Sequence, residues 1–62
     1  MQIEVDGVEI SVEVNTEFDG DQYHTMGILE NGDIVDGFGG TKEEAFVEML
    51  ISLEELLELD RE

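Results

Sequence analysis

The sequence contains no cysteine, no proline and no tryptophan, and only two basic residues among its 62 positions. Without cysteine, neither a disulfide framework nor a thiolate metal site can stabilise so short a chain. No apolar run approaches the roughly 18 residues that a membrane-spanning helix needs. The N-terminus also lacks the basic and apolar segments of a signal peptide. We therefore expect one soluble, cytoplasmic domain over residues 1–62, without cofactor or metal.

Negative charge dominates what the sequence does contain. Eighteen Asp and Glu residues stand against Lys42 and Arg61, which gives a formal net charge of −16 at pH 7. Hydrophobic residues make up 40% of the chain and recur in regular patterns, which favours a folded domain over an acidic disordered one. Such a surface repels nucleic acid and anionic membranes. The expected partner is a basic protein surface, of the kind that binds nucleic acid.

Two alternatives to a charge-directed partner stay open. Haloarchaeal proteins are acidic because carboxylates keep them solvated in concentrated salt, and many small proteins are acidic for solubility alone. A halophilic domain should need molar salt to fold, whereas a partner-binding protein should fold in dilute buffer and lose affinity as salt rises.

The first part of the chain is predicted to form a β-hairpin. Apolar and polar residues alternate over residues 2–14, the period of a half-buried strand pair. Asp6-Gly7 interrupts the alternation and is a preferred dipeptide for a two-residue turn. This turn places Glu4 opposite Glu9, and like charges in that position are destabilising.

A second hairpin is predicted over residues 22–38, after a polar connection at residues 15–21. Asn31-Gly32 is a strong signal for a two-residue turn. With this turn both faces of the hairpin are partly apolar. One side carries Met26, Ile28 and Val35, and the other carries Tyr23, Leu29, Ile34 and Phe38.

The remainder, from Thr41 to about Asp60, is predicted to form one long helix. Thr41 and Glu44 have the spacing of a capping box, in which each side chain bonds the backbone N–H of the other residue. Six apolar residues form a stripe for the sheet: Phe46, Met49, Leu50, Leu53, Leu56 and Leu57. The fold class is therefore α+β, an antiparallel sheet of three to four strands in two hairpins, followed by one C-terminal helix packed on one face.

The helix face opposite this stripe is acidic. It carries Glu43, Glu44, Glu48, Glu54, Glu55 and Glu58. Val47 and Ile51 fall among these acids, one helical turn apart. They either contact a sheet edge or serve as an apolar anchor for a partner or a homodimer, because apolar groups within an acidic face suit an interface better than solvent.

Two segments partly resemble small-ligand sites. Residues 37–45 (GFGGTKEEA) are glycine-rich, but the lysine does not directly follow the last glycine as a phosphate-binding loop requires, so we interpret them as a chain reversal. Residues 15–26 place acids at some positions of a calcium loop, but Met26 replaces the bidentate glutamate. His24 is the only histidine and no base for a nucleophile is evident, so we expect no enzyme activity.

Residues 23–59 resemble the HicB-like antitoxin module. The segment Gly39–Ala45 (GGTKEEA) matches the Gly-x-Thr-x-Glu-Glu-Ala segment that opens the long leucine-rich helix of that family after its strands. The resemblance implies a sheet with one helix, and a small basic ribonuclease as the protein that the module covers. The overall acidic character also resembles the nucleic-acid-mimic inhibitors that phages direct against host defence proteins.

These observations lead to one functional prediction and its alternatives. We predict a non-enzymatic inhibitor that binds and occludes the basic, nucleic-acid-binding surface of a protein partner. The alternatives are a HicB-like antitoxin and a halophilic domain without a charge-directed partner. The residues expected to bind the partner are Glu43, Glu44, Val47, Glu48, Ile51, Glu54, Glu55 and Glu58 on the helix, with Glu4, Glu9 and Glu13 on the sheet.

Overall fold

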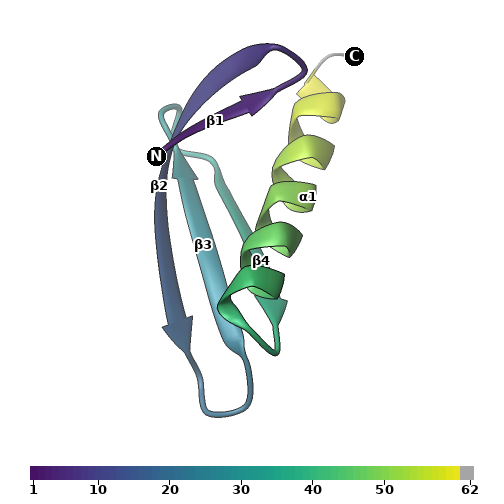
Figure 1. The fold of residues 1–62 in the computed structure, drawn as a ribbon. Coiled ribbons are helices and arrows are strands. Elements are labelled where there is room, and N and C mark those ends of the chain that lie inside the picture. The colour runs from purple at the N-terminus through teal and green to yellow at the C-terminus, as the bar shows by residue number, and fades with distance from the viewer. Residues whose placement is uncertain (61–62) are drawn as a thin grey trace.

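A four-stranded antiparallel sheet and one helix make up the structure, a computed structural model that describes residues 1–60. In chain order the elements are β1 (Gln2–Val5), β2 (Val8–Phe18), β3 (Tyr23–Leu29), β4 (Ile34–Gly39) and α1 (Lys42–Asp60). The strands lie side by side in the same order, and α1 runs along one face of the sheet (Figure 1). The predicted ββββα arrangement of the α+β class is confirmed.

The first hairpin has the predicted two-residue turn. Asp6 and Gly7 both take positive φ angles, 52° and 80°, as a type I′ turn requires. The turn pairs Val5 with Val8, and the next pair along the ladder is Glu4 with Glu9. The predicted register and its pair of opposed glutamates are confirmed.

Strand β2 is longer than predicted. It continues to Phe18, so the polar connection expected at residues 15–21 is wrong for its first four residues. Exposed and partly buried residues continue to alternate from Glu13 to Glu17, and the segment pairs with β3 along its whole length. In the short connection that remains, the Asp19 carboxylate accepts hydrogen bonds from the backbone N–H groups of Asp21 and Gln22. This Asx-type turn reverses the chain between β2 and β3.

The second hairpin has a three-residue loop and not the predicted two-residue turn. The N–H of Leu29 bonds to the carbonyl of Asp33, and the N–H of Gly32 bonds to the carbonyl of Leu29. Gly32 takes a positive φ of 93°, as the residue after a type I turn does in such loops. As a result, Ile28 pairs with Ile34 and not with Val35.

This difference of one residue reverses the two faces of β4, because side chains alternate along a strand. The predicted grouping of Val35 with Met26 and Ile28 is therefore wrong. Val35 is only 5% exposed and lies beneath α1, whereas Ile34 and Phe38 lie on the face away from the helix. The observed register also turns Gly37 towards α1, where the packing of the helix needs a residue without a side chain.

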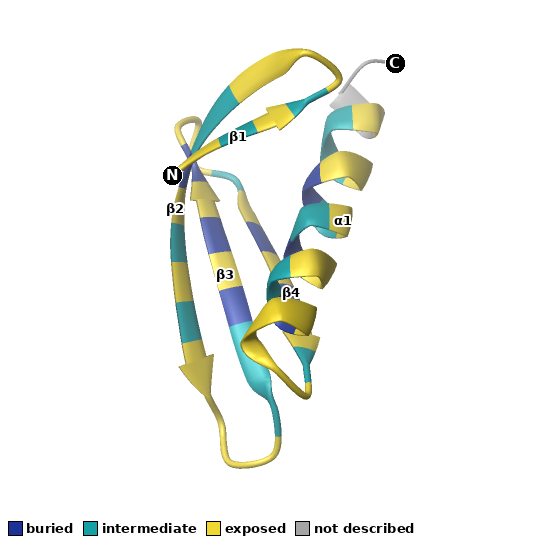
Figure 2. Cartoon of the chain, viewed as in Figure 1, coloured by how far each residue is buried: buried dark blue, intermediate teal, exposed yellow. Residues whose placement is uncertain are grey.

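The core lies between α1 and the inner face of the sheet (Figure 2). Its buried hydrophobic residues are Val12, Leu29, Val35, Ala45, Met49 and Leu53. The other members of the predicted helix stripe pack against this core and are partly buried: Phe46, Leu50, Leu56 and Leu57. The predicted apolar stripe is confirmed. Full burial of a side chain the size of Val, Leu or Met contributes roughly 1.5–3 kcal/mol to folding.

The helix is closest to the sheet at β4. A Cβ atom on Gly37 would collide with the backbone nitrogen of Met49 and the carbonyl oxygen of Ala45. Ser52 adds a hydrogen bond of 2.8 Å from its hydroxyl to the carbonyl of Asp36. Because α1 packs chiefly on β4 and less on β3, most of β2 lies to one side of the helix.

Candidate functional site

The six glutamates predicted to form the acidic face of α1 are all exposed. Glu44 also helps to begin the helix. Its Oε2 accepts the N–H of Gly40 at 3.0 Å, while its own N–H bonds to Thr41 Oγ1 at 3.1 Å. Thr41 therefore caps the helix as expected, but the second bond of the predicted capping box differs, because the Glu44 carboxylate accepts the N–H of Gly40 in place of that of Thr41. These bonds engage N–H groups that a bound phosphate would need, which agrees with residues 37–45 being a chain reversal.

Val47 and Ile51 lie among these glutamates and remain 52% and 44% exposed. Val47 and Phe38 line a shallow hollow of about 350 Å³, together with three glutamates of α1. Val47 therefore faces the edge strand β4, as one of the two predicted roles requires. About half of each side chain still faces solvent, so the edge leaves apolar surface available to a partner.

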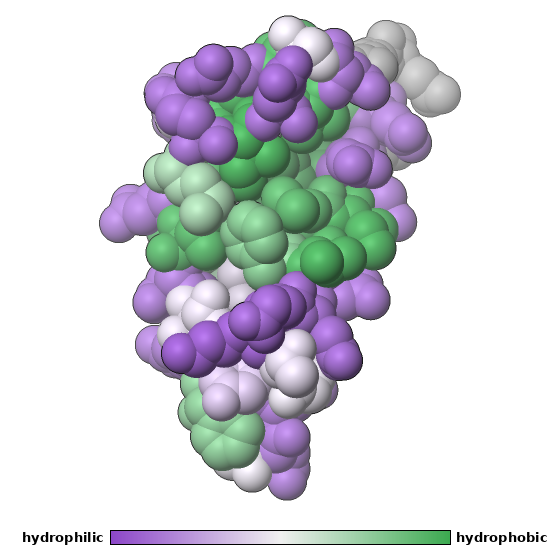
Figure 3. Space-filling view, viewed as in Figure 1, coloured by the Kyte–Doolittle hydropathy of each residue, from purple (hydrophilic) through white to green (hydrophobic). Residues whose placement is uncertain are grey.

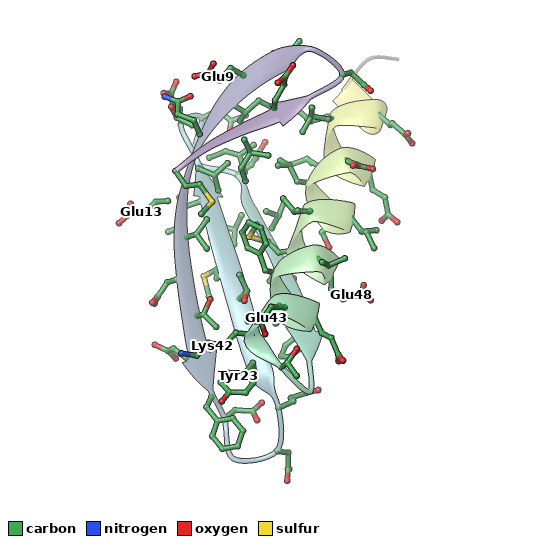
Figure 4. The ribbon with its side chains drawn as sticks, viewed as in Figure 1. Glu9, Glu13, Tyr23, Lys42, Glu43 and Glu48 are labelled. Atoms are coloured by element: carbon green, nitrogen blue, oxygen red, sulfur yellow. The ribbon has the colours of Figure 1, made fainter. Side chains whose placement is uncertain are left out.

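The glutamates predicted on the sheet lie on a different surface from those on the helix. Glu4, Glu9 and Glu13 are exposed and alternate with side chains that face the core, so they point away from α1. Figure 4 shows Glu9 and Glu13 projecting from the β1–β2 side and Glu48 projecting from the far side of α1. The predicted binding residues therefore form two acidic surfaces on opposite sides of the molecule.

A strip of apolar side chains lies on the outer face of the sheet, where the predicted register did not place it. This outer strip consists of Met26, Ile28, Ile34 and Phe38, which are between 36% and 61% exposed. The sequence signal was present, because both faces of the second hairpin are apolar. The incorrect register obscured which residues share the outer face.

His24 occupies one end of the outer strip. Its ring stacks on Phe38, with a centroid separation of 4.3 Å and an interplanar angle of 5°. Its Nε2 lies 3.1 Å from Asp36 Oδ2 on the neighbouring strand. These two contacts fix the orientation of the imidazole. Ser52, whose hydroxyl bonds to a β4 carbonyl, comes from the helix on the other face.

The partial calcium-loop pattern falls on parts of two strands and the turn between them. Asn15 and Glu17 belong to β2, and Met26 belongs to β3. The two N–H hydrogen bonds to the Asp19 carboxylate, from Asp21 first and Gln22 second, lower the pKa of Asp19 below its ordinary value of 3.8. In this structure Asp19 therefore stabilises a turn. Within residues 1–60, no group of three or more His, Asp or Glu side chains is arranged to hold a metal ion.

Comparisons with known proteins add no further assignment. No family model matches the chain, and neither the curated proteins nor the solved structures include a match. In the part of the chain that the structure describes, no helix has the length and apolar character to span a bilayer.

Proposed function

We propose that this chain is a non-enzymatic inhibitor that binds the basic, nucleic-acid-binding surface of a protein partner and occludes it. Inhibitors of this kind act as nucleic-acid mimics, and phages use them against host defence proteins. A cytoplasmic location follows from such a target. The proposal depends mainly on one observation, the density of negative charge along the molecule.

The charge density approaches that of duplex DNA. The molecule is 37 Å long and 18 by 17 Å across. Arg61 and Glu62 cancel, so residues 1–60 carry the same net charge of −16 as the whole chain. Dividing the length by this charge gives one negative charge per about 2.3 Å, against about 1.7 Å along the axis of duplex DNA. A basic surface evolved for DNA or RNA would attract this molecule at a high association rate.

The distribution of the carboxylates also supports the proposal. The glutamates of α1 and those of the β1–β2 hairpin face opposite directions, so the molecule presents negative charge on both sides. The groups best suited to catalysis have other contacts. His24 stacks on Phe38 and lies beside Asp36, and the proposal therefore assigns no reaction.

The direct test is capture of a partner from a cell lysate at about 0.1 M salt, where the Debye length is roughly 10 Å. We expect the immobilised chain to retain one basic protein in stoichiometric amount. Added duplex DNA or RNA should release it, because both ligands need the same surface. A broad set of basic proteins, retained equally well by a charge-matched acidic protein of another fold, would contradict the proposal.

A HicB-like antitoxin is the second proposal. It is supported by the GGTKEEA segment, which joins β4 to α1 at the point where the helix begins. On this proposal the captured protein should be a small basic ribonuclease, and the chain should inhibit its RNA cleavage at a one-to-one ratio. A partner that binds DNA and has no ribonuclease activity would favour the nucleic-acid mimic.

The halophilic alternative makes a different prediction about folding. An inhibitor should show its full circular dichroism spectrum and a cooperative thermal transition in dilute buffer. A domain adapted to concentrated salt should unfold below molar salt, because only screening or hydration at that concentration offsets its self-repulsion. Such behaviour would leave the acidic surface without a charge-directed partner.

A further inference from the structure

The second half of β2 has an unpaired edge. Strand β1 pairs only with Val8–Ser11 of β2, and its last backbone contacts are between Met1 and Val12. From Glu13 to Phe18, β2 pairs with β3 on one side. No other strand within residues 1–60 pairs with this segment on its second side. We call Glu13–Phe18 the open edge.

The backbone groups that face outward at the open edge follow from the hydrogen-bond pattern. Both the N–H and the carbonyl of Val12 bond to Met1, so the backbone polar groups of Val12 point away from β3. In an antiparallel ladder alternate residues point the same way. The N–H and carbonyl groups of Val14, Thr16 and Phe18 therefore face outward, ready to pair with an added strand.

The two faces of the open edge differ in chemistry. The side chains of Glu13, Asn15 and Glu17 lie on the outer face of the sheet and are exposed. Those of Val14 and Thr16 lie on the inner face and are only partly buried. An added strand would therefore meet carboxylates on one face and, on the other, Val14 and Thr16, whose hydroxyl lies 3.0 Å from that of Thr25.

The apolar surface at Val14 continues onto α1. Ser52 and Glu55 of the helix border β4, so at 100° per residue Phe46 and Leu50 project on the side of β2. Both are partly buried and pack against the core with Val14. Figure 3 shows hydrophobic surface across the middle of this side of the molecule, bordered by hydrophilic side chains. We call the surface formed by Val14, Thr16, Phe46 and Leu50 the inner shelf.

We propose that the open edge binds an extended segment of the basic partner as a fifth strand of the sheet. Basic side chains at alternate positions of that segment pair with Glu13 and Glu17, and apolar side chains at the positions between them cover the inner shelf. Main-chain hydrogen bonds supply affinity in this mode of recognition, and the alternating side chains supply specificity. The proposal rests on the proposed function, because it names the part of the partner that is bound.

Charge selects this occupant over a second copy of the chain. Two copies related by a twofold axis centred on Asn15 would oppose Glu13 of one copy to Glu17 of the other. An axis centred on Thr16 would instead oppose Glu13 to Asp19. Like charges in directly opposed positions are destabilising, whereas lysine or arginine at those positions is attractive.

Short peptides test this proposal without knowledge of the partner. The probe is a seven-residue peptide of alternating lysine and valine, blocked at both ends. The N–H and carbonyl groups of its valines pair with the outward-facing residues of β2, and those of its lysines face solvent. N-methylation of the valines should weaken binding at least tenfold, whereas N-methylation of the lysines should change it less than about twofold. Equal effects of the two modifications would overturn the proposal.

Charge reversal in the protein provides a second test with a matched control. Glu13→Lys with Glu17→Lys should lose at least tenfold in affinity for the lysine–valine peptide and gain affinity for a glutamate–valine peptide. Asp33→Lys with Asp36→Lys makes the same change in net charge at β4, the opposite edge of the sheet, and should alter affinity by less than about threefold. The gain for the acidic peptide shows that the variant is folded. Equal losses in both double variants would overturn the proposal.

Amide exchange locates the bound peptide. The N–H groups of Val14, Thr16 and Phe18 should exchange rapidly in the free chain and become protected when the lysine–valine peptide binds. Protection elsewhere, with these three unchanged, would overturn strand addition. A lysate partner whose capture is unaffected by the Glu13 and Glu17 reversal would also overturn it while leaving the proposed function intact. Peptide binding without any captured basic partner would overturn the proposed function and leave strand addition intact.

Discussion

The two hairpins turn on similar dipeptides, Asp6-Gly7 and Asn31-Gly32, yet their loops differ in length. In the first, both residues take positive φ and form the turn alone. In the second, only Gly32 takes a positive φ, and Asn31 instead bonds to Asp33 through both its side-chain amide oxygen and its amide nitrogen. The dipeptide predicts that the chain turns, but it does not fix how many residues the turn contains.

Burial explains the difference between the two hairpins. In the first, a two-residue turn places Ile3, Val5, Val8 and Ile10 on one face, and a three-residue loop would divide them. The second has apolar residues on both faces, so its own pattern allows either register. Packing against α1 selects the register, because only the observed one buries Val35 and places Gly37 against the helix.

The substitution with the largest expected effect on stability is Gly37→Ala. In the observed register the new methyl group meets the backbone of α1, and we expect a loss of about 3 kcal/mol or more. A domain of this size has a total stability of roughly 3–9 kcal/mol, so chemical denaturation should show a severe loss of folded protein. In the two-residue register Gly37 would face solvent and the same change would be mild. Phe38→Ala, on the outer face, is the control.

Val35→Ala and Ile34→Ala form a matched pair in the same strand. Val35 is 5% exposed and Ile34 is 61% exposed. We expect the first change to cost about 2 kcal/mol, because it leaves a cavity in the core, and the second to cost within about 0.5 kcal/mol. Urea denaturation measures both. A reversed order would mean that the second hairpin turns through two residues.

The opposed glutamates of the first hairpin give a smaller effect. Glu9→Lys converts the Glu4–Glu9 pair into an attractive one, and we expect a gain of about 0.5 kcal/mol beyond the general relief of charge. Glu30→Lys, in the loop of the second hairpin, makes the same change in net charge and serves as the control. The difference in melting temperature between the two variants should shrink as salt rises. No difference at low salt would contradict the assigned pairing.

The turn between the two hairpins gives the smallest effect, visible as a pH dependence. The N–H bonds that lower the pKa of Asp19 favour its ionised form in the folded state. Their contribution is therefore complete above the ordinary pKa of 3.8 and is lost as pH falls through the lower folded pKa. At about pH 6 the wild type should have a higher melting temperature than Asp19→Asn, and the gap between the two temperatures should narrow towards about pH 2. A gap that is constant with pH would contradict this role of the Asp19 carboxylate.

The fold could be predicted from the sequence where local signals agree with one another. Alternation around Asp6-Gly7, the Thr41–Glu44 spacing and the apolar stripe of α1 each led to the observed element. The extension of β2 to Phe18 was missed because Asn15, Glu17 and Asp19 give this stretch the composition of a loop. The register of β4 was missed because it depends on α1, which is distant in sequence.

The candidate surfaces could be predicted only in part. Helical periodicity placed the exposed glutamates of α1, with Val47 and Ile51 among them. It did not show that Glu4, Glu9 and Glu13 face the other way. The outer strip depends on the register of β4, and the open edge depends on β1 being shorter than β2. Neither property is encoded in any single segment.

The contact between Met1 and Val12 has a practical consequence for how the protein is produced. The terminal ammonium of Met1 donates to the Val12 carbonyl at 2.8 Å, so the first residue already belongs to the ladder with β2. Because β1 runs antiparallel to β2, any residues added before Met1 would continue towards Glu13 and Phe18. A purification tag at that end would sit where an added strand should pair, and would act as a tethered competitor at high local concentration. Affinity handles therefore belong at the C-terminus.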